Sequence, residues 1–228
     1  MSTLADALNA ISGTLPTDPD GSSIQDRGPF LRMIAVLLKE AGVPDVSETL
    51  DNLGEAGLAD PASLAGTPTI DLLNQLRTSA PRVAPRVAAT LRRLAEWLVE
   101  FEAGQADRLI DPDHSTQSLR DGLGSIKGIG RATADSLVLH ALGRPAFPVD
   151  RGTYRILVRH GWLDLTADYD EAHDLIVHGA SDRIDVLAEA ELALAQIARR
   201  HCRVQAPACS GCPLEPFLPE GGAVEIDA

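Results

Sequence analysis

The sequence predicts an all-α protein. Apolar residues recur at steps of three and four in one segment after another, which is the spacing of a helix face, and residues 83–101 hold the longest such run. No segment alternates apolar and polar residues over a length that would demand a β-strand. Gly and Pro residues separate the helical runs and mark their ends. With 228 residues, the chain can form one large or two small domains with a hydrophobic core.

The expected helices follow in order from the N-terminus. Leu4, Leu8 and Ile11 form an apolar helical face, and residues 14–26, rich in Pro, Gly, Asp and Ser, are typical of a linker. Further runs with helical spacing cover residues 30–41, 46–53, 61–64, 69–76, 83–101 and 186–200. The tail after Pro213 has no regular pattern.

Charge is distributed unevenly along the chain. The net charge of −13 argues against a nucleic-acid partner, because duplex DNA repels an acidic surface. Residues 1–74 hold 3 basic and 11 acidic side chains, and residues 161–228 hold 4 and 13. Residues 75–160, however, hold 13 basic and 9 acidic side chains. A DNA-binding surface is therefore expected there, unless the excess is a chance fluctuation of solvated charge.

The sequence near Met1 has no basic stretch followed by an apolar run, and no run of eighteen apolar residues occurs. We therefore expect neither a signal peptide nor a membrane span. The expected location is the cytoplasm, in association with the nucleoid if the chain binds DNA.

A tight turn is expected at residues 128–130, Gly-Ile-Gly, between helices at 118–125 and 131–142. Both glycines would let the helices approach closely, and Ile129 would fill the gap between them. Gly143 would end the second helix. Amides at the start of that helix would then face outward and could hold a phosphate. Taken alone, a Gly-x-Gly turn more often reflects turn chemistry than a binding site.

The longer pattern resembles the helix-hairpin-helix DNA glycosylase superfamily, and its endonuclease III-like members in particular. The family's hairpin, Leu-x-Gly-Val/Ile-Gly-x-x-Thr-Ala, is matched by residues 126–134, Ile-Lys-Gly-Ile-Gly-Arg-Ala-Thr-Ala. Family members continue with a Gly/Pro loop and a Val-Asp pair that opens the next helix, as Val149 and Asp150 do here at the same spacing. The resemblance is carried by residues 119–212, and earlier only by helix order.

Two helical lobes flanking a DNA-binding cleft are what this resemblance implies. Residues 29–143 would form a helical-barrel lobe that includes the hairpin, and residues 1–28 with 144–228 would form the second lobe. The hairpin would anchor one DNA strand through Lys127, Gly128, Ile129, Gly130, Arg131 and Thr133. Further candidate phosphate contacts are Arg82, Arg86, Arg92, Arg93, Arg131, Arg151, Arg155 and Arg159. The partner would be double-stranded DNA with a lesion or mismatch, bound by a monomer.

Asp150 has two compatible roles. As an N-cap, its carboxylate would accept amide hydrogen bonds from the next helix. By resemblance it matches the catalytic aspartate, whose negative charge would stabilise the sugar cation that forms as the N-glycosidic bond breaks. In the endonuclease III branch a lysine before Thr-Ala forms a Schiff base, but Ala132 stands here. Residues 37–44 also lack the glutamine that fills the vacated base stack there.

These departures leave three functions open. The chain would be a monofunctional glycosylase that removes a damaged or mispaired base. An endonuclease III-like enzyme with lyase activity on oxidised pyrimidines is the alternative within the enzyme class. A DNA-binding protein without catalysis is the alternative from another class. The retained Asp150 favours the first.

Cys202, Cys209 and Cys212 are all the cysteines of the chain, with the spacing C-x6-C-x2-C. Endonuclease III-like proteins hold a [4Fe–4S] cluster with C-x6-C-x2-C-x5-C, but the fourth position here is Leu218. A cluster could take His201, Glu215 or Glu220 as fourth ligand, zinc could bind three thiolates and His201, or the thiols could pack without metal. The three clustered cysteines favour the cluster narrowly.

Overall fold

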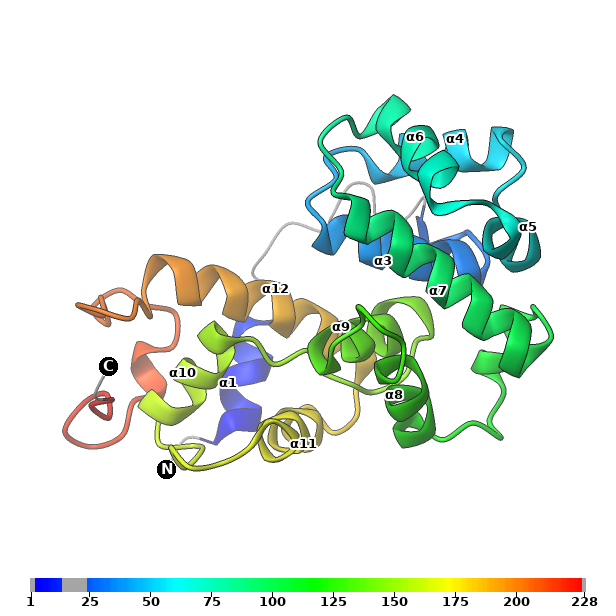
Figure 1. Ribbon diagram of the computed structural model, residues 1–228. Helices are drawn as coiled ribbons and strands as arrows, with labels where there is room; N and C mark the ends of the chain where they lie inside the picture. The colour runs from blue at the N-terminus through cyan, green and yellow to red at the C-terminus, as the bar shows by residue number, and fades with distance from the viewer. Residues whose placement is uncertain (1–2, 14–23, 227–228) are drawn as a thin grey trace. The chain divides into compact units, whose positions relative to one another are not determined.

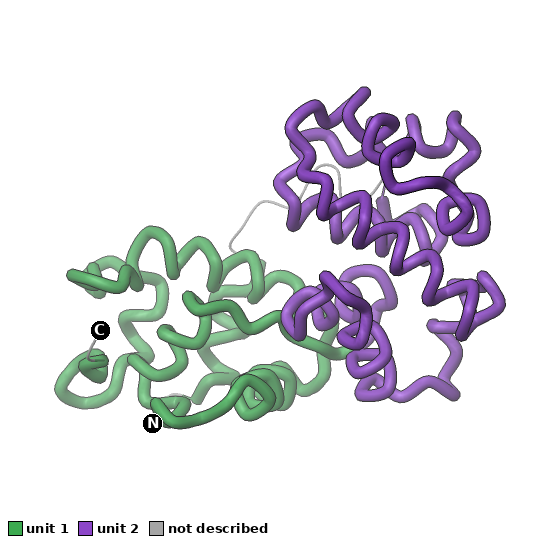
Figure 2. Tube along the Cα trace, in the orientation of Figure 1, with its two compact units in different colours: residues 1–16, 145–228 green, residues 17–144 purple. Residues whose placement is uncertain are grey.

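The computed structural model describes residues 3–13 and 24–226, and all regular structure in these two ranges is helical. The prediction of an all-α protein is therefore confirmed. The chain divides into two compact units, coloured separately in Figure 2: unit 1 comprises Met1–Pro16 and Pro145–Ala228, and unit 2 comprises Thr17–Arg144. The predicted linker lies mostly outside the described residues.

Unit 2 is built from seven α-helices, a 3-10 turn and a π-helical turn among its described residues. In chain order these are α3 (Pro29–Glu40), α4 (Val46–Glu55), α5 (Pro61–Gly66), α6 (Thr69–Ser79), α7 (Pro85–Glu102), η1 (Ala106–Ile110), α8 (Thr116–Gly124), α9 (Arg131–Ser136) and η2 (Leu137–Ala141). The long helix α7 packs against α3, α5 and α6 (Figure 1). Pro85 at its first turn starts α7 two residues later than the apolar pattern predicts, because proline fits that position best.

The second hairpin helix is less regular than expected. The sequence predicts one helix over residues 131–142, but the structure widens to a π-helical turn from Leu137, with the amide of Leu142 donating to the Leu137 carbonyl at 3.2 Å. This turn packs on α3 and buries Leu137 and Val138 fully. Gly143, at φ +63°, ends the helix in the left-handed conformation that glycine adopts without strain.

Unit 1 joins both ends of the chain. Its elements are α1 (Leu4–Ile11), α10 (Arg151–Arg159), α11 (Tyr169–Gly179), α12 (Ile184–Arg200) and η3 (Glu215–Phe217). Helix α12 packs against α10 and α1, and α1 also packs against α11. The apolar face of α1 predicted from sequence is buried in these contacts.

Helix α11 was not predicted. Its buried face includes His173 beside only a few apolar residues, so its hydrophobic pattern is weak. A capping box at its start was the available signal: the Asp168 carboxylate accepts from the Glu171 amide at 2.9 Å, and the Glu171 carboxylate accepts from the Asp168 amide at 2.7 Å.

The sequence boundaries of the two units differ from those predicted for the two lobes. Residues 17–28 and Arg144 fall in unit 2. Arg27 forms an ion pair with Asp51 of α4 at 2.7 Å, and Arg144 donates to the carbonyls of Ile110 and Asp111 at 2.9 and 2.6 Å. These contacts hold Arg27 and Arg144 against other residues of unit 2. Among the described helices, none combines the length and apolar character needed to cross a membrane.

A buried ion pair joins the two helices of the hairpin. Arg120 of α8 donates through Nε and Nη2 to the two carboxylate oxygens of Asp135 on α9, the second contact at 3.3 Å. Both side chains are at most one-tenth exposed. A buried charge that loses its partner is strongly destabilising, whereas a matched pair is not.

We predict that Asp135→Ala lowers the free energy of unfolding by about 3–5 kcal/mol, because it removes the carboxylate that accepts two hydrogen bonds from the largely buried Arg120 guanidinium. Urea unfolding followed by circular dichroism measures this change. Asp121→Ala, at an exposed position of α8, is the matched control and should change stability by less than about 0.5 kcal/mol. Equal unfolding midpoints for the two variants would contradict the prediction.

Candidate functional site

The hairpin turn is shaped by Ile129 and Gly128. Ile129 is buried, as predicted, and its amide donates to the Ile126 carbonyl at 2.9 Å. Gly128 has φ +105°, and a Cβ at this position would lie 2.5 Å from Thr90 Oγ1 on α7. Both its backbone conformation and its close neighbour therefore require glycine.

Gly130 is the N-cap of α9, and the reason for a glycine here differs from the expected one. Its φ of −85° is accessible to any residue, and a Cβ would meet nothing within 4 Å. Close approach of the two hairpin helices thus explains neither glycine, because the close neighbour of Gly128 lies on α7 and Gly130 has none within 4 Å. The open space lies directly before the first turn of α9, where no side chain caps the amides. Such a helix start suits a phosphate oxygen.

The other predicted DNA-binding residues lie in different surroundings. Lys127 and Arg131 are exposed on either side of the turn, and Arg93 of α7 donates to the Lys127 carbonyl at 3.1 Å. Thr133 is half-buried, and its hydroxyl donates to Glu40 Oε2 at 2.9 Å. The Ile129 side chain points inward, so only its backbone could contact DNA. Phosphate binding at this turn stays a prediction.

Asp150 stands at the start of α10 in unit 1. Its Oδ1 accepts from the Thr153 amide at 2.6 Å, which makes it the N-cap of the helix, as expected. The side chain nevertheless remains exposed. One carboxylate oxygen is therefore held by the backbone while the group stays accessible to a substrate.

Two residues around Asp150 were missed from the sequence. The hydroxyl of Tyr169 on α11 accepts from the Val149 amide at 3.3 Å and so fixes the peptide that precedes Asp150. Gly152 is buried against Ala198 of α12, where a Cβ would come within 2.6 Å of the alanine methyl. Neither has a sequence signal, because both depend on contacts with distant helices. Asp150 belongs to unit 1, whereas the hairpin belongs to unit 2.

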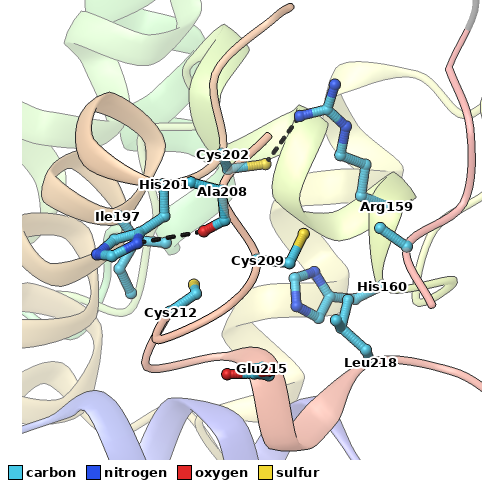
Figure 3. Close-up of a pocket in the computed structure, with 11 residues that line it drawn as sticks. Arg159, His160, Ile197, His201, Cys202, Ala208, Cys209, Cys212, Glu215 and Leu218 are labelled. Atoms are coloured by element: carbon cyan, nitrogen blue, oxygen red, sulfur yellow. Dashed lines mark hydrogen bonds between the residues drawn. The ribbon is translucent and has the colours of Figure 1, made fainter. Parts of the chain in front are cut away.

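The three cysteines line the same small cavity of about 20 Å³ in unit 1 (Figure 3). Its wall also contains Arg159, His160, Ile197, His201, Ala208, Glu215, Leu218 and Ala223. Burial raises the pKa of the Cys212 thiol, and the nearby Cys209 and Cys202 add to the shift. These shared surroundings confirm that the cysteines gather in space.

Arginines of α10 hold the segment from Cys202 to Cys212, the cysteine loop, in place. Arg159 is buried and donates to the carbonyls of Arg203 and Val204 at 2.6 and 2.9 Å, and to Cys202 Sγ at 3.4 Å (Figure 3). Arg155 donates to the Cys202 carbonyl at 2.7 Å. Arg159 therefore cannot contact phosphate, which corrects the expectation from its charge.

The donor set does not fit a four-thiolate cluster. Leu218, at the fourth ligand position, lines the cavity with an apolar side chain. Glu215 Oε2 accepts from the Gly211 amide at 2.8 Å, and the His201 ring bonds the Ala208 carbonyl at 3.3 Å. Across residues 3–13 and 24–226, no three His, Cys, Asp or Glu side chains are arranged to hold a metal ion.

Comparison with known proteins gives sequence relatives in DNA repair. A protein of Methanocaldococcus jannaschii, provisionally named a DNA repair glycosylase, is 27% identical over 183 residues, or 80% of this chain and 81% of its own length. Endonuclease III of Bacillus subtilis is 28% identical over 137 residues, 59% of this chain and 56% of its own. Endonuclease III of Sulfolobus acidocaldarius is 31% identical over 59% of each chain. No family model matches.

Solved structures share the fold. A non-covalent endonuclease III–DNA complex aligns over 97% of both chains with a TM-score of 0.64 and 23% identity. A thermostable thymine-DNA glycosylase aligns over 94% of this chain and 92% of its own with a TM-score of 0.64 and 16% identity. Taken together with the hairpin and Val-Asp motifs, these relatives and this fold support the resemblance of the chain to the helix-hairpin-helix DNA glycosylase superfamily, on its endonuclease III-like side.

Proposed function

We propose that this chain is a base-excision-repair DNA glycosylase that hydrolyses the N-glycosidic bond of a damaged or mispaired base in double-stranded DNA. The observation that carries the proposal is the Asp150 carboxylate, exposed at the start of α10 and held by the Thr153 amide. The names of the sequence relatives, a DNA repair glycosylase and two endonucleases III, support the same activity. We further propose that the protein acts as a monomer in the cytoplasm.

Asp150 would supply the chemistry. As the bond to the base breaks, positive charge develops on the sugar, and a fixed carboxylate stabilises it. The same group can orient or deprotonate the attacking water. The hydrogen bond from Thr153 keeps one oxygen in place, so little reorganisation is needed when charge appears. The target base would first leave the helical stack to become accessible.

The hairpin would hold the DNA backbone beside the lesion. Its exposed turn offers Lys127, Arg131 and the open start of α9 to phosphate oxygens. The buried pair Arg120–Asp135 and the bond from Arg93 to the turn fix these groups before DNA binds. Preorganised contacts lose less conformational entropy on binding.

Hydrolysis without lyase chemistry fits the residues best. A Schiff base needs an amine that reaches the sugar carbon, and Ala132 stands where the endonuclease III branch has its lysine. The chain has only two lysines, Lys39 and Lys127, and both are exposed. We therefore favour the monofunctional glycosylase over the bifunctional enzyme.

For the cysteine loop we propose an assembly without a [4Fe–4S] cluster. Arg155 and Arg159 supply hydrogen bonds to three loop carbonyls, and Leu218 fills the wall at the fourth ligand position. No step of the reaction above depends on a metal.

We predict that Asp150→Asn lowers the single-turnover rate of base excision by about 100-fold or more. Affinity for DNA should stay equal or rise, because a negative charge near phosphate is removed. Asparagine is also a good N-cap, so the fold should persist. A panel of lesion duplexes and a binding titration measure both effects.

Asp168→Asn is the matched control, since Asp168 caps α11 in the same way and its change should leave excision intact. Full excision by Asp150→Asn would refute the catalytic assignment. Loss of excision by both variants would point to a structural cause. If the unaltered protein bound the duplexes but excised nothing from the panel, the DNA-binding alternative would stand.

Borohydride reduction should trap no covalent complex between the protein and an abasic duplex, because residue 132 carries no amine. Denaturing gel electrophoresis shows a trapped complex as a shifted band. Ala132→Lys provides the counterpart, and a band should appear only with this variant. Efficient trapping by the unaltered protein would favour the bifunctional alternative, and loss of the band in Lys127→Ala would identify the amine.

Anaerobically purified protein should be colourless, with iron and zinc each well below one per chain by elemental analysis. Cys209→Ser should then shift the melting temperature by less than about 4 °C, the equivalent of about 1 kcal/mol. Arg159→Leu should destabilise by at least about 2 kcal/mol, because it leaves two loop carbonyls without their donor. Brown protein with about four irons, or stoichiometric zinc, would overturn the proposal.

A further inference from the structure

The chain reaches Asp150 through a segment without regular structure, residues 145–149, which lies between η2 and α10. Two of its residues are prolines, which have no amide hydrogen to donate. Among the residues that the structure describes, the Val149 amide is the only backbone group of this segment that forms a hydrogen bond. Its acceptor is the Tyr169 hydroxyl, at 3.3 Å. The backbone directly before Asp150 is therefore tied to α11 through one side chain.

Packing and this hydrogen bond constrain the segment in different ways. The side chains of Ala146 and Phe147 are fully buried, and Val149 is 7% exposed. Apolar burial holds these side chains inside unit 1, but it is non-directional. A hydrogen bond, by contrast, fixes the direction of the amide that donates it. The Tyr169 hydroxyl therefore sets the direction in which the backbone enters Asp150.

The Asp150 carboxylate is held from its other side by the amide of Thr153, at 2.6 Å. We propose that Tyr169 is a positioning residue for Asp150: its hydroxyl fixes the Val149 amide, and with it the backbone from which the carboxylate projects. This inference rests on the proposed function, because it concerns the carboxylate assigned to that reaction.

Loss of the Tyr169 hydroxyl would leave the buried Val149 amide without an acceptor. A buried donor without a partner is costly, so the segment would shift until the amide met water or another acceptor. Asp150 is bonded to Val149, and its carboxylate would move with the backbone. Catalysis is sensitive to small misplacements of a reacting group. The rate of excision should therefore fall, although the carboxylate itself is unchanged.

Two phenylalanine variants separate positioning from stability. Tyr169→Phe removes the hydroxyl and keeps the ring. Tyr154→Phe is the matched control, because its hydroxyl bonds the carbonyls of Leu165 and Ala167 at 2.8 and 2.9 Å. That loop follows α10 and does not lead into the carboxylate. The control removes shorter hydrogen bonds, so it should lower the melting temperature at least as much as Tyr169→Phe.

The excision rates should follow the opposite order. Single-turnover excision with saturating protein should be about threefold to tenfold slower in Tyr169→Phe and unchanged in Tyr154→Phe. The affinity for the lesion duplex should stay the same in both variants, because no phosphate contact is altered. A merely structural role would instead make the less stable variant the slower one.

A binding measurement tests the position of the carboxylate without excision. A duplex that carries a pyrrolidine ring in place of one sugar is positively charged at neutral pH and resembles the sugar cation, whereas a tetrahydrofuran ring is neutral. A fixed carboxylate stabilises the charged ring, so the unaltered protein should bind the pyrrolidine duplex more tightly. This preference should fall about threefold or more in Tyr169→Phe and persist in Tyr154→Phe.

An unchanged rate and an unchanged preference for pyrrolidine in Tyr169→Phe would overturn the proposal. Rate losses that rank with the losses of stability would overturn it as well. A Tyr169→Phe protein that does not fold would have the same meaning, because the hydroxyl would then serve the fold alone. By contrast, an unaltered protein that excises no base and shows no preference between the two rings would contradict the proposed function itself.

Discussion

The contact between α10 and α12 is the constraint on which the arrangement of unit 1 depends. A nine-residue helix has room for few interactions, and α10 uses nearly all of its turns. Its start holds Asp150, its first turn touches Ala198, and its later turns carry Arg155 and Arg159 to the cysteine loop. Because these groups share one short rigid element, a shift of α10 on α12 would move the carboxylate and the loop together.

Most of the fold could be predicted from the sequence because its helices have strong apolar periodicity. The faces of α1, α3 and α7 follow directly from residues spaced three and four apart. Helix α11 was not predicted because His173 occupies part of its buried face. The π-helical turn at Leu137 was not predicted because residues 131–142 keep helical spacing throughout. Proline at residue 85 outweighed the apolar pattern that precedes it. Apolar spacing within each segment thus predicted where most helices lie, but it did not predict their exact ends or their local geometry.

The candidate site was predictable where a motif fixes the residue type and hidden where a distant partner does. Gly128 and Asp150 stand in contiguous patterns, and the structure gives each a local reason, the left-handed φ of one and the helix cap of the other. Arg159 was wrongly predicted to contact phosphate. The sequence of a basic stretch does not distinguish an arginine that faces solvent from one that donates to three acceptors of the cysteine loop. Gly152 and Tyr169 gave no signal, since their partners, Ala198 on α12 and the amide of Val149, are distant in sequence.

The discontinuity of unit 1 has a consequence for synthesis on the ribosome. Unit 2 is one continuous stretch and can fold as soon as Arg144 has emerged. Helix α1 emerges first, yet the helices that cover it, α11 and α12, begin at Tyr169 and Ile184. At about 5–20 residues per second, the apolar face of α1 stays uncovered for roughly nine to thirty-five seconds, until α12 begins to emerge. During that interval Leu4, Leu8 and Ile11 are apolar side chains without the helices that bury them, and such exposed apolar surface on a nascent chain favours aggregation.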